Sequence, residues 1–151
     1  MLTVKVKKLS EQGILPKYNN KTDSGMDFYT PIDLTINPGE SKLVPLDIAL
    51  ALPESYELQV RPTSGNTVKT KMRVQLGTVD NGYRGNLGIM MDNIGSEPVT
   101  FERGRKIAQG VLVKVPQALI LEVEDFEDET ERGTKGYGSS DAVLGHLGVN
   151  K

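Results

Sequence analysis

Cysteine and tryptophan are absent from this 151-residue sequence, and histidine occurs once, as His146. Without cysteine the chain cannot form a disulfide, a thiolate nucleophile, a Cys-ligated zinc site or an iron–sulfur cluster. A single histidine argues against a histidine-rich metal site and against a Ser-His-Asp hydrolase. Any catalyst in this sequence must therefore use carboxylates, hydroxyls, backbone amides and cations.

The sequence also lacks a strong charge imbalance and long apolar runs. Lys and Arg number 18 against 20 Asp and Glu, a formal net charge of -2, which disfavours a broad nucleic-acid surface. No run approaches the ~18 apolar residues of a membrane span, and the first residues lack the apolar region of a signal peptide. We therefore expect one soluble, cytoplasmic domain that binds neither nucleic acid nor membrane.

Short β-type runs separated by turn formers make up most of the chain. Residues 2–7 alternate apolar and polar side chains, as a strand with one buried face does. Turn formers such as Asn37-Pro38-Gly39 punctuate the chain, which contains 16 Gly and 8 Pro. Further strands are expected at 32–36, 41–50, 56–60, 86–91, 99–101 and 106–115. The pattern predicts an all-β barrel or sandwich, with one or two helical turns at 64–69.

The composition changes near residue 121. Seven acidic residues crowd the stretch 122–131, and a Gly-rich segment, 132–140, follows. Like charges in series repel one another and resist packing, and glycines leave the backbone flexible until a ligand orders it. We predict a single domain with a β core over 1–123 and an acidic linker with a mobile C-terminal arm over 124–151.

Five clusters of polar and glycine residues carry the candidate chemistry. Alone, each is compatible with an ordinary turn, a strand edge or a flexible tail. Asp80 beside an Asn-Gly turn fits a hairpin, and 132–140 offers amides, hydroxyls and cations that suit phosphate but lacks the P-loop pattern. The clusters lie at 24–29, 61–67, 77–88, 103–111 and 132–140.

In this order the five clusters resemble the five motifs of the trimeric deoxyuridine triphosphatase (dUTPase) family, and the sequence is similar to its bacterial and phage-type members. The resemblance implies a β jelly roll, or distorted β-barrel, that forms a homotrimer with active sites built from motifs of different subunits. It also implies hydrolysis of dUTP to dUMP and pyrophosphate. That activity limits uracil incorporation into DNA and supplies dUMP for dTTP synthesis.

The third motif carries the implied catalyst. Asp80 would deprotonate the water that attacks the α-phosphorus, because water with its free pKa of about 15.7 is a poor nucleophile. Tyr83 would pack under the deoxyribose and exclude a 2′-hydroxyl. Main-chain groups around Leu87, Gly88 and Met90 would read uracil, because the amino group of cytosine would meet a donor there.

The other motifs imply contacts with the triphosphate, the base and a metal. Asp27 would hold water bound to a Mg²⁺ ion that the three phosphates chelate, which is the coordination expected for this ion. Tyr137 would stack on uracil, and Arg132 would neutralise the γ-phosphate. The further implied substrate contacts are Ser64, Gly65, Gln109, Gly133, Gly138, Ser139 and Ser140.

Three of the five motifs depart from the usual pattern. Thr63 replaces the Arg that commonly precedes Ser-Gly in the second motif, and Arg105-Lys106 replaces Asp-Arg in the fourth. Lys135 stands where Gly is usual in the fifth motif. Our hypothesis is that Arg105 or Lys135 supplies the phosphate cation that is missing at Thr63.

Two other functions stay open on this fold. A dCTP deaminase would need a general acid/base Glu where this sequence has Met90, whose thioether cannot shuttle protons, so deamination is disfavoured. A dUTP-dependent regulatory protein would retain nucleotide binding and signal to a protein partner, and the altered motifs leave room for it. The sequence identifies no such partner and gives no role to residues 141–151.

Overall fold

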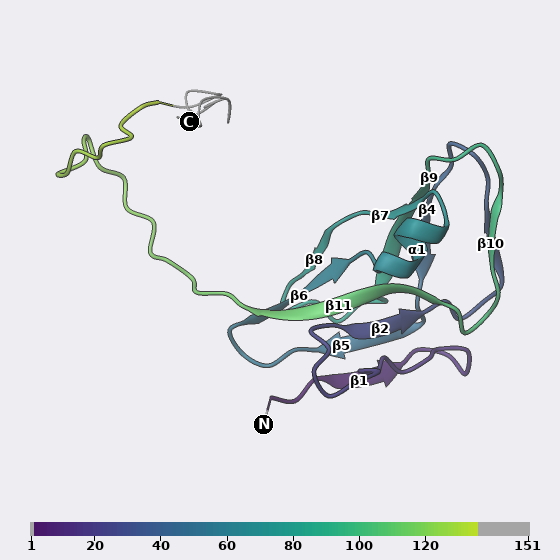
Figure 1. Ribbon diagram of the computed structural model, residues 1–151. Coiled ribbons are helices and arrows are strands. Elements are labelled where there is room, and N and C mark those ends of the chain that lie inside the picture. The colour runs from purple at the N-terminus through teal and green to yellow at the C-terminus, as the bar shows by residue number, and fades with distance from the viewer. Residues whose placement is uncertain (1, 136–151) are drawn as a thin grey trace, which may run out of the picture. The chain divides into compact units, whose positions relative to one another are not determined.

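The computed structural model describes residues 2–135, which fall in two compact units, Met1–Gln117 and Ala118–Lys151. The first unit holds the regular structure of the described residues, which is eleven strands and one short helix. Figure 1 shows how these elements are arranged. Over 118–135 the second unit consists of turns and irregular chain. No helix in the described part of the chain is long and apolar enough to cross a membrane.

Most of the strands are short. They are β1 Lys5–Lys8, β2 Met26–Tyr29, β3 Leu34–Ile36, β4 Ser41–Pro45, β5 Ile48–Ala51, β6 Tyr56–Arg61, β7 Met72–Val74, β8 Gly77–Val79, β9 Gly88–Asn93, β10 Val99–Phe101 and β11 Lys106–Lys114. The helix, α1, spans Ser64–Lys69 and buries none of its residues. It is tied to β11 by Asn66, whose side-chain amide donates to the carbonyl of Lys106 at 2.9 Å.

Antiparallel pairing joins these strands into sheets. The nine-residue strand β11 lies between β2 and β6, and the sheet runs in the order β2-β11-β6-β8. Strand β9 lies between β4 and β7, while β1 pairs with β5 and β10 pairs with β3. In the larger sheet Gln109 of β11 stands opposite Asp27 on one side and Arg61 on the other. The first, second and fourth motifs therefore meet along β11.

One apolar core holds the sheets together. Phe28, Ile36, Leu58, Ile89 and Ile107 come from five different strands, and each side chain is at most 1% exposed. Burial of an aliphatic or aromatic side chain of this size stabilises a fold by about 1.5–3 kcal/mol. The core also fixes β11, because a Cβ at position 110 would lie 2.5 Å from the Phe28 ring, and only glycine fits there.

The all-β prediction is confirmed, with local exceptions. The expected strands 32–36, 56–60, 86–91, 99–101 and 106–115 correspond to β3, β6, β9, β10 and β11, and α1 occupies the expected helical turns. The run 41–50 is instead two strands, because the chain turns between them at Asp47, whose φ is 55°. Strand β2 was not predicted, since Met26, Asp27 and Phe28 are all buried and leave no alternation to detect.

Candidate active site

A cleft of about 790 Å³ lies between the second-motif loop and the fourth-motif turn. Its walls are residues 63–66, 69–70, 99–102 and 104–106. We call it the cationic cleft, because Lys69, Arg105 and Lys106 line it and Glu102 is the one acidic residue of its walls. Among residues 2–135 Lys69 and Arg105 form no ion pair, and the three cations of the walls outnumber the single carboxylate of Glu102, so the cleft has an excess of positive charge that attracts an anion.

Two side-chain amides hold the walls of the cationic cleft together. Asn66 Nδ2 donates to the carbonyl of Lys106 at 2.9 Å, and Gln109 Nε2 donates to the carbonyl of Pro62 at 2.9 Å. A Cβ at position 25 would lie 2.7 Å from Gln109 Oε1, so glycine is needed beside this amide. The fold thus brings Ser64, Gly65 and Arg105, all predicted phosphate contacts, into one cleft with Gln109 supporting it.

Thr63 carries an unpaired hydroxyl at this cleft. The residue lines the cleft, its hydroxyl is buried, and that oxygen has no hydrogen-bond partner in the described chain. Thr63 is also the N-cap residue of α1, yet its side chain does not cap the helix. A buried hydroxyl without a partner costs about 1–3 kcal/mol. The position that departs from the usual second motif therefore carries a local free-energy cost.

Asp27 lies next to the cleft, on β2. The residue is 8% exposed, and its Oδ2 is 3.2 Å from the Nζ of Lys106. Its main-chain N–H donates to the carbonyl of Lys17 at 2.8 Å, which fixes the strand on the other side. Burial first, and then the negative charge of Asp27, raise the pKa of Tyr29 on the same strand. Asp27 is thus a shielded carboxylate that one cation of the cleft neutralises.

The residues around Asp27 fit a magnesium ion only if the substrate supplies further ligands. No group of three or more His, Asp and Glu residues in the range 2–135 is placed to hold a metal. Mg²⁺ is commonly bound through one or two carboxylates, with waters and substrate phosphates as the other ligands. A single buried carboxylate beside a cleft for anions matches that donor set.

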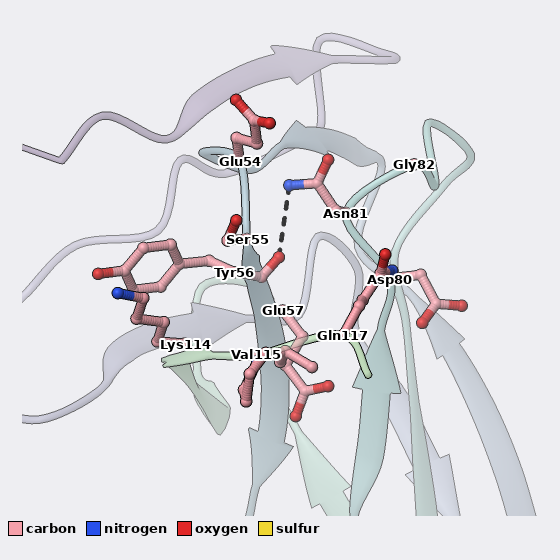
Figure 2. A pocket seen from close by; sticks show the side chains of 11 residues that line it. Glu54, Ser55, Tyr56, Glu57, Asp80, Asn81, Gly82, Lys114, Val115 and Gln117 are labelled. Carbon is pink, nitrogen blue, oxygen red and sulfur yellow. Dashed lines mark hydrogen bonds between the residues drawn. The ribbon is translucent and has the colours of Figure 1, made fainter. Parts of the chain in front are cut away.

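Asp80 lies in a different pocket, of about 520 Å³, which we call the Asp80 pocket. It follows β8 and is exposed. Figure 2 shows Asp80 and Gln117 on one side of this pocket, with the Asp80 carboxylate directed away from Tyr56 and Lys114 on the other. The base of the hairpin is anchored by the amide of Asn81, which donates to the carbonyl of Tyr56 at 3.4 Å.

Tyr83 folds back over its own hairpin. Its N–H donates to the carbonyl of Asp80 at 3.1 Å, and its hydroxyl donates to the carbonyl of Asn86 at 2.9 Å. A Cβ at position 85 would lie 2.6 Å from Tyr83 Cζ, so glycine leaves the room that the ring occupies. The ring is nevertheless 48% exposed, which leaves one side open to a ligand.

The predicted uracil-reading residues differ in how their main-chain groups are used. The N–H and C=O of Leu87 are both hydrogen-bonded at 2.8 Å to residues 46–48. Because alternate residues of an antiparallel strand turn their polar groups to opposite sides, Gly88 and Met90 direct theirs to the other edge of β9. There the carbonyl of Met90 accepts from the N–H of Gln75 at 3.0 Å.

The fifth motif belongs to the second unit. Within it, the N–H of Gly133 donates to the carbonyl of Thr130 at 3.0 Å, and the φ of Gly133 is 52°. Arg132 Nε donates to the carbonyl of Lys135 at 3.2 Å, which closes a compact turn. The remaining predicted contacts of this motif, Tyr137, Gly138, Ser139 and Ser140, lie outside the described residues.

The first unit therefore contains two groups of predicted residues in separate pockets. Asp27, Ser64, Gly65, Arg105 and Gln109 gather at the cationic cleft. Asp80 lines a pocket that shares no residue with that cleft.

Sequence reasoning gave no role to Asn66, Lys69 or Lys106. Lys106 and Asp27 are 79 positions apart in the sequence, so only the three-dimensional structure, in which β11 pairs with β2, shows that they are in contact.

A cationic cleft and an exposed hairpin carboxylate on a small all-β fold are features that suit an enzyme acting on phosphate esters or anhydrides. The chain belongs to the dUTPase family, whose sequence pattern matches residues 11–141. The deoxyuridine 5′-triphosphate nucleotidohydrolase of Gloeothece citriformis is 45% identical to it over 141 residues, 92% of this chain and 97% of that protein. The resemblance drawn from the five motifs is confirmed, as is the jelly-roll fold class.

Solved structures give the same result. The dUTPase of Staphylococcus bacteriophage 80alpha, bound to dUpNHpp, superposes with a TM-score of 0.88 at 31% identity, covering 93% of this chain and 99% of that one. It is described among phage dUTPases that control transfer of virulence genes by a G protein-like mechanism. A variant dUTPase from phage phi11 of S. aureus, which coordinates a structural Mg(II) ion, superposes with a TM-score of 0.80 at 28% identity, covering 83% and 99%.

Proposed function

We propose that this protein hydrolyses dUTP to dUMP and pyrophosphate. The observation that carries the proposal is the family's sequence pattern over 11–141, which includes both the cationic cleft and the exposed carboxylate of Asp80. A cytoplasmic location stays a prediction.

Asp80 is the proposed general base. Its carboxylate takes a proton from water as the water oxygen attacks the α-phosphorus, and the bond to the bridging oxygen between the α- and β-phosphates breaks. Pyrophosphate then leaves with that oxygen, and dUMP remains. The exposed position of Asp80 at the end of β8 supports this role, because a nucleotide and a water molecule can both reach it.

The hairpin that follows Asp80 is the proposed nucleoside site. The open side of the Tyr83 ring would lie under the deoxyribose, where no room remains for a 2′-hydroxyl. Gly88 and Met90, whose main-chain groups turn away from β4, would read uracil, while Leu87 would hold the strand in place. Rejection of cytosine follows because its amino group would leave a donor unpaired, at a cost of about 1–3 kcal/mol.

The cationic cleft is the proposed triphosphate site. Ser64 and Gly65 would donate to phosphate oxygens, Gln109 would hold the cleft closed, and Arg105 would supply the charge that Thr63 lacks. From the second unit, Arg132, Gly133 and Lys135 would add phosphate contacts, with Ser139 and Ser140. Tyr137 would stack on uracil, and Gly138 would add a further substrate contact.

A magnesium ion is the proposed cofactor, and Asp27 would hold it through water. When bound, the ion would neutralise phosphate charge and orient the triphosphate. The donor set of one buried carboxylate beside an anion cleft supports the assignment. The structural Mg(II) ion of the phi11 protein supports only that a relative binds this metal.

Sites shared between copies of the chain are also proposed, within a homotrimer. Asp80 and the cationic cleft line pockets of one chain that share no residue, which supports a site that a second copy completes. Each active site would then combine the hairpin of one subunit with the cleft of a neighbour and the arm of the third.

Product analysis with dUTP, dCTP, dTTP and UTP, each with Mg²⁺, tests the proposal, with Asp80→Asn as the matched variant. We expect dUTP alone to be converted, to dUMP and pyrophosphate, and the variant to lose roughly 10²- to 10⁴-fold in rate. The variant should bind a nonhydrolysable dUTP analogue and unfold at the wild-type temperature. Full activity of Asp80→Asn, or release of ammonia from dCTP, would contradict the assignment.

A second candidate function is dUTP-dependent regulation. The 80alpha protein favours it, because that protein is among the phage dUTPases that control transfer of virulence genes. Tight binding of dUTP without turnover by the wild-type chain would support this candidate over hydrolysis. Thr63→Arg is then the first change to make, because it restores the usual second-motif cation at the cleft. A gain of turnover in that variant would assign the loss of catalysis to Thr63.

A further inference from the structure

Lys106 lines the cationic cleft and also contacts the carboxylate of Asp27. Its ammonium pairs with Asp27 at 3.2 Å, and its side chain, 45% exposed, also lines the cleft beside Ser64 and Arg105. Asp27 itself, with a side chain 12% exposed, is not part of the cleft wall. A ligand in the cleft therefore meets Lys106 before it meets the carboxylate of Asp27.

The backbone of Lys106 is fixed, and its side chain is the part that can move. Lys106 pairs with Tyr29 at the start of β11, next to a register shift in the ladder with β2. Its carbonyl accepts the hydrogen bond from Asn66 Nδ2 at 2.9 Å. A lysine side chain on a fixed backbone has a long flexible stem and can carry its charge between two partners a few ångströms apart.

No other cation in the described chain pairs with Asp27. Lys17 bridges Asp27 at the edge of β2 opposite β11 and contributes its carbonyl to the Asp27 N–H, while its ammonium lies 5.9 Å from the centre of the Tyr29 ring. If Lys106 leaves, Asp27 is a shielded carboxylate without a counter-charge, and it must gain another cation or repel the incoming phosphates.

We propose that Lys106 is an exchangeable counter-ion: it neutralises Asp27 while the site lacks Mg²⁺ and nucleotide, and it turns into the cleft to meet a phosphate oxygen once a hydrated Mg²⁺ takes its place. Lys106 thereby couples the binding of the metal to the binding of the triphosphate. This inference rests on the proposed function of the cleft and adds a role for a residue that the motifs do not assign.

The test compares Lys106→Met with Lys69→Met, which removes a cation of the same cleft that has no acidic partner among residues 2–135. The dissociation constant of dUpNHpp is measured without and with Mg²⁺. The value without Mg²⁺ divided by the value with Mg²⁺ is the ratio that reports the coupling. In Lys106→Met the bare Asp27 repels the triphosphate without Mg²⁺ and binds the hydrated ion without a competitor. We expect the ratio to rise roughly three- to tenfold.

The control should behave differently. Lys69→Met should weaken analogue binding by the same factor with and without Mg²⁺, so its ratio stays at the wild-type value. Lys106→Arg, which keeps the charge, should return most of the wild-type ratio. In an Asp27→Asn background, Lys106→Met should change the ratio no further, because the group it neutralises is gone.

Two outcomes would overturn the inference. If Lys106→Met lowers the unfolding temperature and weakens the analogue equally with and without Mg²⁺, Lys106 only fastens β11 to β2. If it raises the ratio to the same extent in the Asp27→Asn background, Lys106 acts without Asp27. A wild-type protein that binds no dUpNHpp in either condition would instead overturn the proposed function, and this inference with it.

Discussion

In the cationic cleft, side chains bond to backbone carbonyls that lie 40 and 47 residues away, from Asn66 to Lys106 and from Gln109 to Pro62. In the hairpin after Asp80, by contrast, Tyr83 bonds to residues three positions away on either side. The cleft thus depends on the whole sheet around β11, whereas the Tyr83 ring is held by its own turn, and only the base of the hairpin is tied to distant chain, from Asn81 to the carbonyl of Pro53 at 2.6 Å. The position of the Tyr83 ring therefore follows from local sequence, and the cleft follows from tertiary structure.

The same contrast holds for charge. The cleft concentrates three cations and a shielded carboxylate, which suits a polyanion and a metal ion. The hairpin presents one exposed carboxylate and one half-exposed aromatic ring, which suits a nucleoside and a water molecule. The two halves occupy separate pockets of one chain.

Mixing two inactive variants tests most strongly whether the halves come from different copies. Asp80→Asn disables the hairpin and Ser64→Ala weakens the cleft, so each homotrimer should be slow. Random mixing of the two should restore about a quarter of the wild-type rate, because a hairpin from one copy then meets a cleft from the other. The rate of pyrophosphate release is measured after co-expression.

Separately expressed variants that are combined without subunit exchange serve as the control. No recovery after verified mixing would mean that each chain completes its own site, and the proposed sharing would be wrong.

Gly85→Ala tests whether the hairpin is self-contained. The added Cβ would lie 2.6 Å from Tyr83 Cζ, so the ring must move. We expect the preference for dUTP over UTP, measured as the ratio of kcat/KM values, to fall about tenfold. Gly82→Ala is the matched control, because a Cβ there meets nothing within 4 Å. Unchanged discrimination in Gly85→Ala would remove Tyr83 from the sugar site.

Gly110→Ala tests the dependence of the cleft on β11. The new methyl group would lie 2.5 Å from Phe28 Cε2 and 2.9 Å from Leu58 Cδ1. Overpacking of this kind lowers the free energy of unfolding by about 1–3 kcal/mol, which urea denaturation measures. Gly82→Ala should leave the midpoint unchanged. A wild-type midpoint in Gly110→Ala would mean that the sheet yields more easily than its packing indicates.

The smallest expected effect concerns Asp92, which lies on β9 beyond the hairpin. Hydrogen bonds from Ser41 first, and then from Gln75 at 3.0 and 3.1 Å, hold the pKa of this exposed carboxyl below its ordinary value. A carboxyl with a lowered folded-state pKa adds stability above its unfolded-state pKa and loses it as the pH falls through the folded value.

Asp92→Asn should therefore be slightly less stable than wild type at pH 7, and the difference should vanish in acid. Thermal unfolding at both pH values measures it. A difference that persists in acid would assign the effect to lost packing and not to charge.

Local patterns predicted much of the fold. The expected strands over 56–60, 99–101 and 106–115 formed because their apolar residues and flanking turns agree with the final sheet. Strand β2 was not predicted because it is buried on both faces, and β7 and β8 are the other strands that the local pattern did not indicate. The division of the chain at residue 123 stays a prediction.

The sequence by itself determined the class of fold, the family and the types of residue at the site, because turn chemistry, short alternating runs and ordered motifs are local properties. Only the tertiary structure decided which of those residues meet. It placed Lys106 against Asp27, joined Asn66 to β11 and kept Asp80 in a separate pocket. The reason is physical: strand register follows from packing of the whole core, and no short stretch of sequence contains that information.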